Sequence, residues 1–281
     1  MFRLALALII LLASPAQAAD QSTCGKVEGP RPYGYCITVT PGSKTKDVLY
    51  VLHGAGGDGK GDWWVTDPAL DGIKENFKKA GYQPRVIEVS FGAVWLLVPQ
   101  TKNPRSGLLE IFTDHVMPEL EGKLEGKVAK RKILGHSMGG LNGAILALTR
   151  PDLFKAAALM APAFLGVSPF AGPEAQAQYE QSRGMPAGYA KNVLSIARAY
   201  VNSEEEWKEI SPTIIAPDLA GFGRADFLVS AGPEDILFFE EARIFAEQVK
   251  KNDAFTVWDK HEHGHGFVSS SAIASFLSLP F

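Results

Sequence analysis

The chain has 281 residues, of which 46% are hydrophobic and 21% charged, and its formal net charge is −3 at pH 7. The chain has no excess of lysine and arginine of the kind that nucleic-acid-binding proteins carry, so we expect no nucleic-acid partner. The length is sufficient for one large α/β domain with a sizeable core.

The first 19 residues differ from the rest of the chain. Arg3 precedes an apolar run over 4–12 and a small-residue stretch that ends at Ala18. This order is typical of a secretory signal peptide, and the run is too short to span a bilayer comfortably. We expect a signal peptide at 1–19, a single domain at 20–281, and export to the periplasm or the cell exterior with no stable membrane span after cleavage. An uncleaved membrane anchor is the alternative.

Cys24 and Cys36 are the two cysteines of the chain. An isolated pair in an exported protein indicates a disulfide, which here would close a short loop rich in glycine and proline. Two free buried thiols are the alternative. Neither cysteine lies near the predicted chemistry, so we expect both to be structural.

Apolar runs and helical spacings alternate along the rest of the chain. In chain order they predict a strand at 35–40, a strand at 47–54, a helix at 70–82, a strand at 85–92, a helix at 107–124, a strand at 130–137, a helix at 138–154, a strand at 155–164, a helix at 203–210, a strand and loop at 224–235, a helix at 236–253, a strand with a histidine-rich exit at 255–267, and a helix at 269–279. Strands that alternate with helices predict a mostly parallel sheet covered on both faces. The interval 165–223 breaks the rhythm, and we expect a cap or lid insertion there.

The stretch "LGHSMGG" (134–140) contains G-x-S-x-G between a predicted strand and a predicted helix. A serine nucleophile on such an elbow needs small neighbours on both sides, and Gly135 and Gly139 meet that need. Small residues in the first turns of the following helix also let it lie close to the sheet. The pattern therefore predicts Ser137 as a nucleophile.

A serine hydroxyl needs a base, and the base needs an acid that orients it. On an elbow of this kind the chain order is serine, acid, histidine. His265 is the preferred base because glycines flank it, with His263 second and His261 third. Asp235, on the exit loop of the penultimate strand, is the predicted acid. Glu234 is its competitor, and a helix N-cap is the alternative role for Asp235.

Acyl chemistry also needs N–H donors that face the developing oxyanion. The backbone N–H of Met138, directly after the serine, is one predicted donor. The other is the N–H of Ala55, in the glycine-rich loop "VLHGAGGDG" (51–59). Phosphate binding is the alternative role for this loop, but no G-K-[ST] follows it. We expect His53 to be structural within the loop.

The alternating histidines of "HEHGH" (261–265) raise the alternative of a metal site. The pattern is not H-E-x-x-H on a helix, and the sequence shows no remote ligand set. We expect no metal and no cofactor. His136 and His115 are predicted to pack or to form hydrogen bonds.

Together these residues resemble the family named "Putative esterase" of the α/β-hydrolase superfamily, which includes esterase D, feruloyl and enterochelin esterases, and mycolyltransferases. The matching stretches are "YVLHGAGGD" (50–58), "DHVMPELE" (114–121), "KILGHSMGGLNGAILALTRPDLFKAAALMAP" (132–162), "FLVSAGPED" (227–235) and "HGHGF" (263–267). The resemblance implies an α/β-hydrolase fold and a serine carboxylesterase, and it gives Ser137, Asp235 and His265 their roles. It does not specify a substrate.

The sequence thus predicts an exported serine hydrolase that cleaves a small-molecule or polymer-borne carboxylic ester through an acyl-enzyme. An acyltransferase on the same three residues is one alternative, because the acyl-enzyme chemistry is shared. A non-catalytic binding protein on a hydrolase scaffold is another. The apolar residues of 91–99 and 164–170 line an acyl pocket or belong to the core, and the sequence does not decide between these two interpretations.

Overall fold

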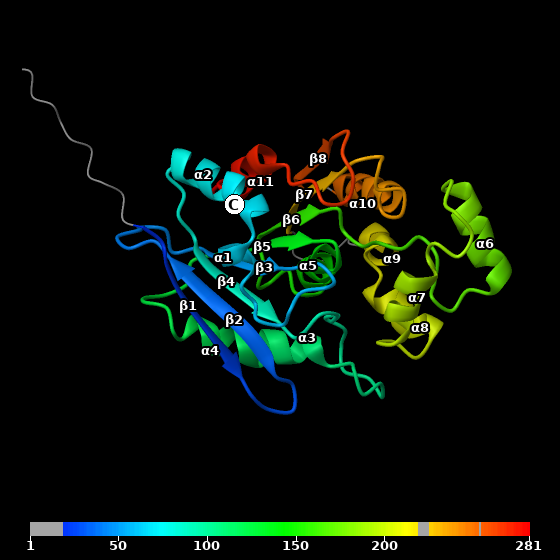
Figure 1. The fold of residues 1–281 in the computed structure, drawn as a ribbon, viewed down its shortest axis with the longest axis horizontal. Coiled ribbons are helices and arrows are strands. Elements are labelled where there is room, and N and C mark those ends of the chain that lie inside the picture. Colours follow the sequence, from blue (N-terminus) through cyan, green and yellow to red (C-terminus); the bar gives the residue numbers. More distant parts are fainter. Residues whose placement is uncertain (1–18, 219–224, 253) are drawn as a thin grey trace, which may run out of the picture.

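An eight-stranded sheet forms the centre of the structure (Figure 1), a computed structural model that describes residues 19–218, 225–252 and 254–281. The spatial order is β1-β2-β4-β3-β5-β6-β7-β8. The strands are β1 (Gln21–Val27), β2 (Tyr33–Val39), β3 (Val48–Leu52), β4 (Arg85–Ser90), β5 (Arg131–His136), β6 (Ala156–Met160), β7 (Asp226–Ala231) and β8 (Thr256–Lys260). The β1–β2 and β2–β4 pairs are antiparallel, and the remaining pairs are parallel. The prediction of a mostly parallel sheet is confirmed.

The central strand β3 shows why its sequence is a continuous apolar run. Its five residues are all fully buried. Tyr50 and Leu52 pack into the hydrophobic core on one face of the sheet, and Leu49 and Val51 pack into the core on the other. Because both faces are covered, alternation between apolar and polar residues is absent from this strand.

Helices cover both faces of the sheet. They are α1 (Trp63–Thr66), α2 (Asp71–Lys79), α3 (Leu108–Glu110), α4 (Met117–Glu121), α5 (Met138–Thr149), α6 (Pro173–Ser182), α7 (Lys191–Arg198), α8 (Glu204–Ile210), α9 (Pro212–Ile215), α10 (Phe239–Lys251) and α11 (Ser270–Leu277), with short 3₁₀ turns at η1 (Pro68–Leu70) and η3 (Ala216–Asp218). Helices α2 and α11 pack together over one core, whereas α5, α10 and the α3–α4 region cover the other.

The single helix predicted at 107–124 is three consecutive segments. A π-helical stretch, η2 (Ile111–Val116), separates α3 from α4. Pro118 lies at the start of α4 and has no N–H to donate to a carbonyl one turn earlier. The change in hydrogen bonding next to this proline accounts for the local departure from α-helical geometry.

The predicted insertion at 165–223 contains four helices, α6 to α9, to the side of the sheet (Figure 1). Only α8 was expected from the sequence. Polar contacts join this region to the rest of the chain: Tyr200 Oη donates to Val94 O at 2.8 Å, Arg183 pairs with Glu241 at 2.6 Å, and Asn103 Nδ2 donates to Ala199 O at 3.2 Å, among others. Residues 219–223 lie outside the described part of the chain.

Strand β1 was not expected, because its sequence is mostly polar. It forms an exposed edge of the sheet and pairs only with β2. Cys24 and Cys36 face each other across these two strands and form a disulfide, as predicted. The predicted signal peptide at 1–19 lies, except for residue 19, outside the described residues. Within the described ranges, no helix is long and apolar enough to cross a bilayer.

Candidate active site

Ser137 occupies the tight turn between β5 and α5. Its φ of 54° and ψ of −116° lie in a region that residues with a side chain rarely adopt. Backbone hydrogen bonds fix this conformation: Ser137 N–H donates to Met160 O at 2.9 Å, and Ser137 O accepts from Leu141 N–H at 3.0 Å and Ala163 N–H at 2.9 Å. The hydroxyl therefore sits on a turn with a strained but well-supported backbone.

The two glycines of the motif allow this turn to form. A Cβ on Gly135 would lie 2.3 Å from Gly139 O, and a Cβ on Gly139 would lie 1.9 Å from Leu52 O. Both distances are far below van der Waals contact, so only glycine fits. The close approach brings the start of α5 against the end of β3, and Ser137 against the loop that follows β3.

Ser137, His265 and Asp235 form a continuous hydrogen-bonded series. His265 Nε2 lies 2.8 Å from Ser137 Oγ, and His265 Nδ1 lies 2.7 Å from Asp235 Oδ2. The Asp235 carboxylate is only 6% exposed. In a neutral imidazole, Nδ1–H donates to the carboxylate, and the Nε2 lone pair is then free to accept the serine hydroxyl proton. The structure thus brings together the three residues expected from three separate loops.

The alternative residues for the acid and the base are not part of this hydrogen-bonded series. Glu234 and His263 are exposed, and the rings of His263 and His261 pack on Phe267 with centroids 4.1 Å and 4.5 Å away. The N-cap role proposed for Asp235 is wrong: helix α10 begins at Phe239, and its N-cap residue makes no side-chain cap hydrogen bond.

The three histidines of the "HEHGH" stretch do not converge. Both ring nitrogens of His265 are engaged by Ser137 and Asp235, whereas His261 and His263 stack on each other. In the part of the chain that the structure describes, no group of three or more His, Cys, Asp or Glu side chains could hold a metal ion.

The expected oxyanion donors, Met138 N–H and Ala55 N–H, lie beside Ser137. Met138 is the first residue of α5, a position where the N–H has no acceptor within the helix. Ala55 lines the same cavities as Ser137. Among the described residues, neither N–H donates to a backbone carbonyl in a turn or loop.

Buried His53 holds the loop that carries Ala55. Its Nδ1 lies 2.6 Å from Gly54 O, and its Nε2 lies 2.6 Å from Ser90 Oγ and 3.1 Å from Trp95 Nε1. Because the indole N–H can only donate, His53 Nε2 is an acceptor and Nδ1 carries the proton. Burial lowers the pKa of His53, which favours this neutral form. The structural role expected for His53 extends beyond its own loop, to Ser90 and Trp95.

His136 supports the loop that carries His265. Its Nε2–H donates to the backbone carbonyl of His265 at 2.8 Å. Burial lowers the pKa of His136, so the ring stays neutral and the bond does not depend on a charge. The sequence indicated a packing or hydrogen-bonding role for His136 but gave no sign of this partner.

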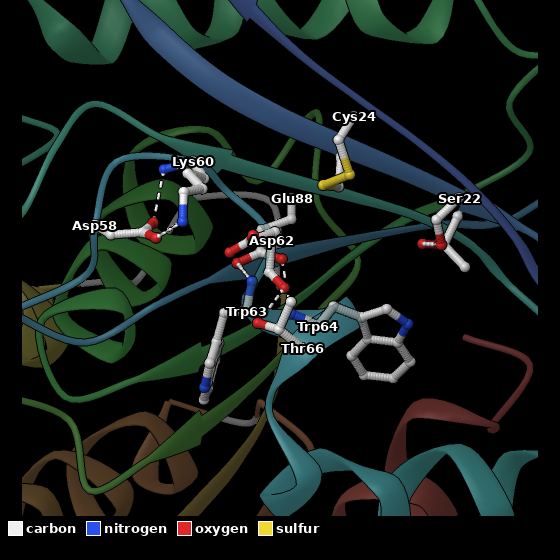
Figure 2. The surroundings of a disulfide bond; sticks show 11 residues. Ser22, Cys24, Asp58, Lys60, Asp62, Trp63, Trp64, Thr66 and Glu88 are labelled. Atoms are coloured by element: carbon white, nitrogen blue, oxygen red, sulfur yellow. Dashed lines mark hydrogen bonds and ion pairs between the residues drawn. A yellow bond between two sulfur atoms is a disulfide. The ribbon is translucent and has the colours of Figure 1, made fainter.

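Glu88 is a residue near the site that the sequence analysis missed. It lies on β4, is fully buried, and accepts hydrogen bonds from the N–H groups of Trp63 and Trp64, both at 2.7 Å (Figure 2). Burial raises the pKa of this carboxyl to about 8, against the opposing effect of the two N–H donors. The sequence feature that could have identified Glu88 is a single carboxylate within the mostly apolar strand "RVIEVS".

The family of the chain follows from a match over most of its sequence. The model of the family described as "Putative esterase" matches residues 26–217, about two thirds of the chain. The chain belongs to this esterase family. It is a hydrolase of the carboxylesterase type.

Solved structures share the α/β-hydrolase fold of the esterase at low identity. A ferulic acid esterase has 16% identity and a TM-score of 0.62, over 94% of this chain and 98% of that one. An S-formylglutathione hydrolase from Agrobacterium tumefaciens has 14% identity and a TM-score of 0.61, over 94% and 95%. Brefeldin A esterase, a bacterial homologue of human hormone-sensitive lipase, has 17% identity and a TM-score of 0.60, over 99% and 76%. No curated protein matches the esterase in sequence.

Two cavities of different character meet at Ser137 of the esterase. One is a polar cleft of about 400 Å³ lined by the glycine-rich loop, Asp62, Trp63 and His265. The other is a pocket of about 160 Å³ lined almost entirely by apolar side chains, among them Leu141. The serine hydroxyl therefore has access to a polar space on one side and an apolar space on the other.

We predict that Glu88→Gln flattens the pH dependence of the esterase's stability. The folded-state pKa of about 8 lies above the ordinary value of 4.5, so the folded protein keeps a proton that the unfolded chain releases. The free energy of unfolding of the wild type should therefore fall as pH rises from about 4.5 to 8, by at most about 1.4 kcal/mol per pH unit from this group, and level off above. Urea unfolding at pH 5, 6.5 and 8 measures this slope. Equal slopes in wild type and variant would contradict the prediction.

Proposed function

We propose that the esterase cleaves carboxylic esters through a covalent acyl-enzyme on Ser137, with His265 as general base and acid and Asp235 as the group that orients His265. The observation that carries this proposal is the unbroken series from the Asp235 carboxylate through both ring nitrogens of His265 to Ser137 Oγ, with distances of 2.7 and 2.8 Å. A nucleophile activated by an adjacent base that is itself oriented by a third group is the arrangement acyl transfer requires.

In the first half of the reaction, Ser137 Oγ attacks the acyl carbon while His265 Nε2 takes the hydroxyl proton. The carbonyl oxygen becomes an oxyanion, which accepts hydrogen bonds from Met138 N–H and Ala55 N–H. The bond from carbon to the alcohol oxygen then breaks, and His265 gives its proton to the departing alcohol. In the second half, His265 activates a water molecule that attacks the acyl-enzyme and releases the acid.

The buried Asp235 carboxylate supports His265 in two ways. It accepts the Nδ1–H, which selects the tautomer with a free Nε2 lone pair, and it stabilises the imidazolium that forms during attack. Its own backbone is held in place, since Asp235 N–H donates to Gly232 O at 2.9 Å and Asp235 O accepts from Phe239 N–H at 2.9 Å.

Export is the second part of the proposal, supported by the disulfide between Cys24 and Cys36. Disulfides persist in oxidising compartments and are rare in the cytosol. Removal of residues 1–19 during export would leave a mature chain that begins just before β1.

One experiment tests both parts. The full chain is expressed with its own leader in a bacterium with a periplasm, and the periplasmic protein is treated with a fluorophosphonate. We expect an intact mass that lacks 1–19 and a single phosphonate adduct, which peptide mapping locates on Ser137. Heat-unfolded protein is the control and should not react. An unlabelled folded protein would refute the serine mechanism, whereas a retained leader would refute only the export proposal.

A further inference from the structure

We propose that the two cavities at Ser137 divide the substrate: the apolar pocket holds the acyl group and the polar cleft holds the alcohol. This assignment rests on the proposed function. It identifies the substrates as esters between an apolar acyl group of about six carbons, the size of group that an apolar cavity of about 150 Å³ accommodates, and a polar alcohol without negative charge.

The position of His265 decides which cavity takes which half of the ester. The leaving alcohol must receive its proton from His265 Nε2, so it departs on the side where that ring is exposed. His265 lines the polar cleft and does not line the apolar pocket. Met138, one of the two oxyanion donors, lines the apolar pocket instead. The alcohol therefore lies in the cleft, and the acyl group extends from Ser137 into the apolar pocket.

The apolar pocket is closed by the inserted region. Val193 and Ile196 of α7 form one side, Leu141 of α5 forms another, and Leu165 and Phe238 are among the other apolar residues that line it. Val193 and Ile196 are each only partly buried, as expected for residues that face an unfilled space. Because they belong to the 165–223 insertion, this insertion sets the size of the acyl group.

The polar cleft presents carboxylates and an aromatic ring. Asp58, Asp62 and buried Glu88 line it, and Lys60 of the same loop pairs with Asp58 at 2.6 Å and is attracted to the charge of Asp62 (Figure 2). No lysine or arginine among the described residues lines the cleft itself. Asp58 and Asp62 together outweigh the single charge of Lys60, so an anionic alcohol would meet net like charge. A neutral hydroxyl can instead donate to Asp62, and a ring or chain can pack on Trp63.

The acyl assignment is tested with nitrophenyl esters from two to twelve carbons and with variants of α7. We expect the wild-type kcat/KM to be highest near six carbons, because an apolar cavity of this size accommodates a group of about six carbons. Ile196→Trp, which fills the pocket, should lower kcat/KM for the six-carbon ester about 10- to 100-fold while sparing the two-carbon ester. Ile196→Ala, which enlarges the pocket, should move the optimum to longer chains. Asn192→Trp, at an exposed position of the same helix, is the matched control and should change neither.

The alcohol assignment is tested with two hexanoate esters that differ only in charge, those of ethylene glycol and of glycolate. The wild type should prefer the neutral ester by about tenfold or more, and Asp62→Asn should reduce that preference. Equal rates for the two esters in the wild type would overturn the assignment for the cleft. An optimum that stays unchanged in both Ile196 variants would overturn the assignment for the pocket.

If these failures occur while the fluorophosphonate still labels Ser137, the serine mechanism stands and only the subsite assignment falls. If neither labelling nor turnover is seen, both fall.

Discussion

Ser137→Ala is expected to lower kcat for ester hydrolysis by a factor on the order of 10⁶. The variant lacks the oxygen that bonds to the acyl carbon, so the acyl-enzyme cannot form. The backbone donors of Met138 and Ala55 remain, and they can still polarise a bound carbonyl. Any residual turnover should therefore come from direct attack of water and should leave no acyl adduct on the protein.

The alanine variant should fold like the wild type, which separates lost chemistry from lost structure. The hydrogen bonds that fix this turn involve the backbone of Ser137 and not its hydroxyl. Alanine keeps the same Cβ at the positive φ, so no new strain arises. Turnover of a six-carbon nitrophenyl ester and the melting temperature are measured together. A variant that retains wild-type turnover would show that Ser137 is not the nucleophile.

Gly139→Ala is expected to lower the free energy of unfolding by about 3 kcal/mol or more, the upper range for overpacking a rigid site. The added methyl would lie 1.9 Å from Leu52 O and 2.7 Å from His53 O, both backbone atoms of a buried strand end. Relief requires α5 and β3 to separate, which would also move the loop that carries Ala55. Activity should therefore fall even where the variant still folds.

Gly143→Ala on the same helix is the matched control. Its added methyl would lie 2.9 Å from Ile133 Cγ2 and 3.2 Å from Leu159 Cδ2, which are side-chain atoms. Alanine also gains up to about 1 kcal/mol of helix propensity over glycine at either position. Denaturant unfolding should show a much smaller loss for Gly143→Ala than for Gly139→Ala. Equal losses would mean that the approach of α5 to Leu52 is not the limiting contact.

The buried strands were predictable from sequence because burial on both faces of the sheet requires a continuous run of apolar residues. Strands such as β3 and β6 consist wholly of apolar residues and were expected within a few residues of their observed ends. Strand β1 and helix α6 were missed for the opposite physical reason. Most of their residues face solvent, so their sequences contain too few apolar positions to show the hydrophobic periodicity of a strand or a helix.

The residues proposed for catalysis were predictable as types in a chain order, but their distances were not. Glycine flanks and loop positions favoured His265 over His263, and the structure places His265 next to Ser137. The supporting contacts of His136 and Glu88 depend on side chains that meet across distant segments, and no local pattern encodes such a meeting. The apolar pocket likewise arises only when α7 packs over α5 and the elbow.

The disulfide at the edge of the sheet has a consequence for producing the protein. Strand β1 is mostly exposed and pairs with one neighbour, so few apolar contacts hold it in place. The covalent bond between Cys24 and Cys36 joins it permanently to β2. In a reducing host β1 would be free to detach, and the uncovered edge of β2 would present unpaired backbone groups to other chains. Production under oxidising conditions therefore protects this esterase from edge-to-edge aggregation.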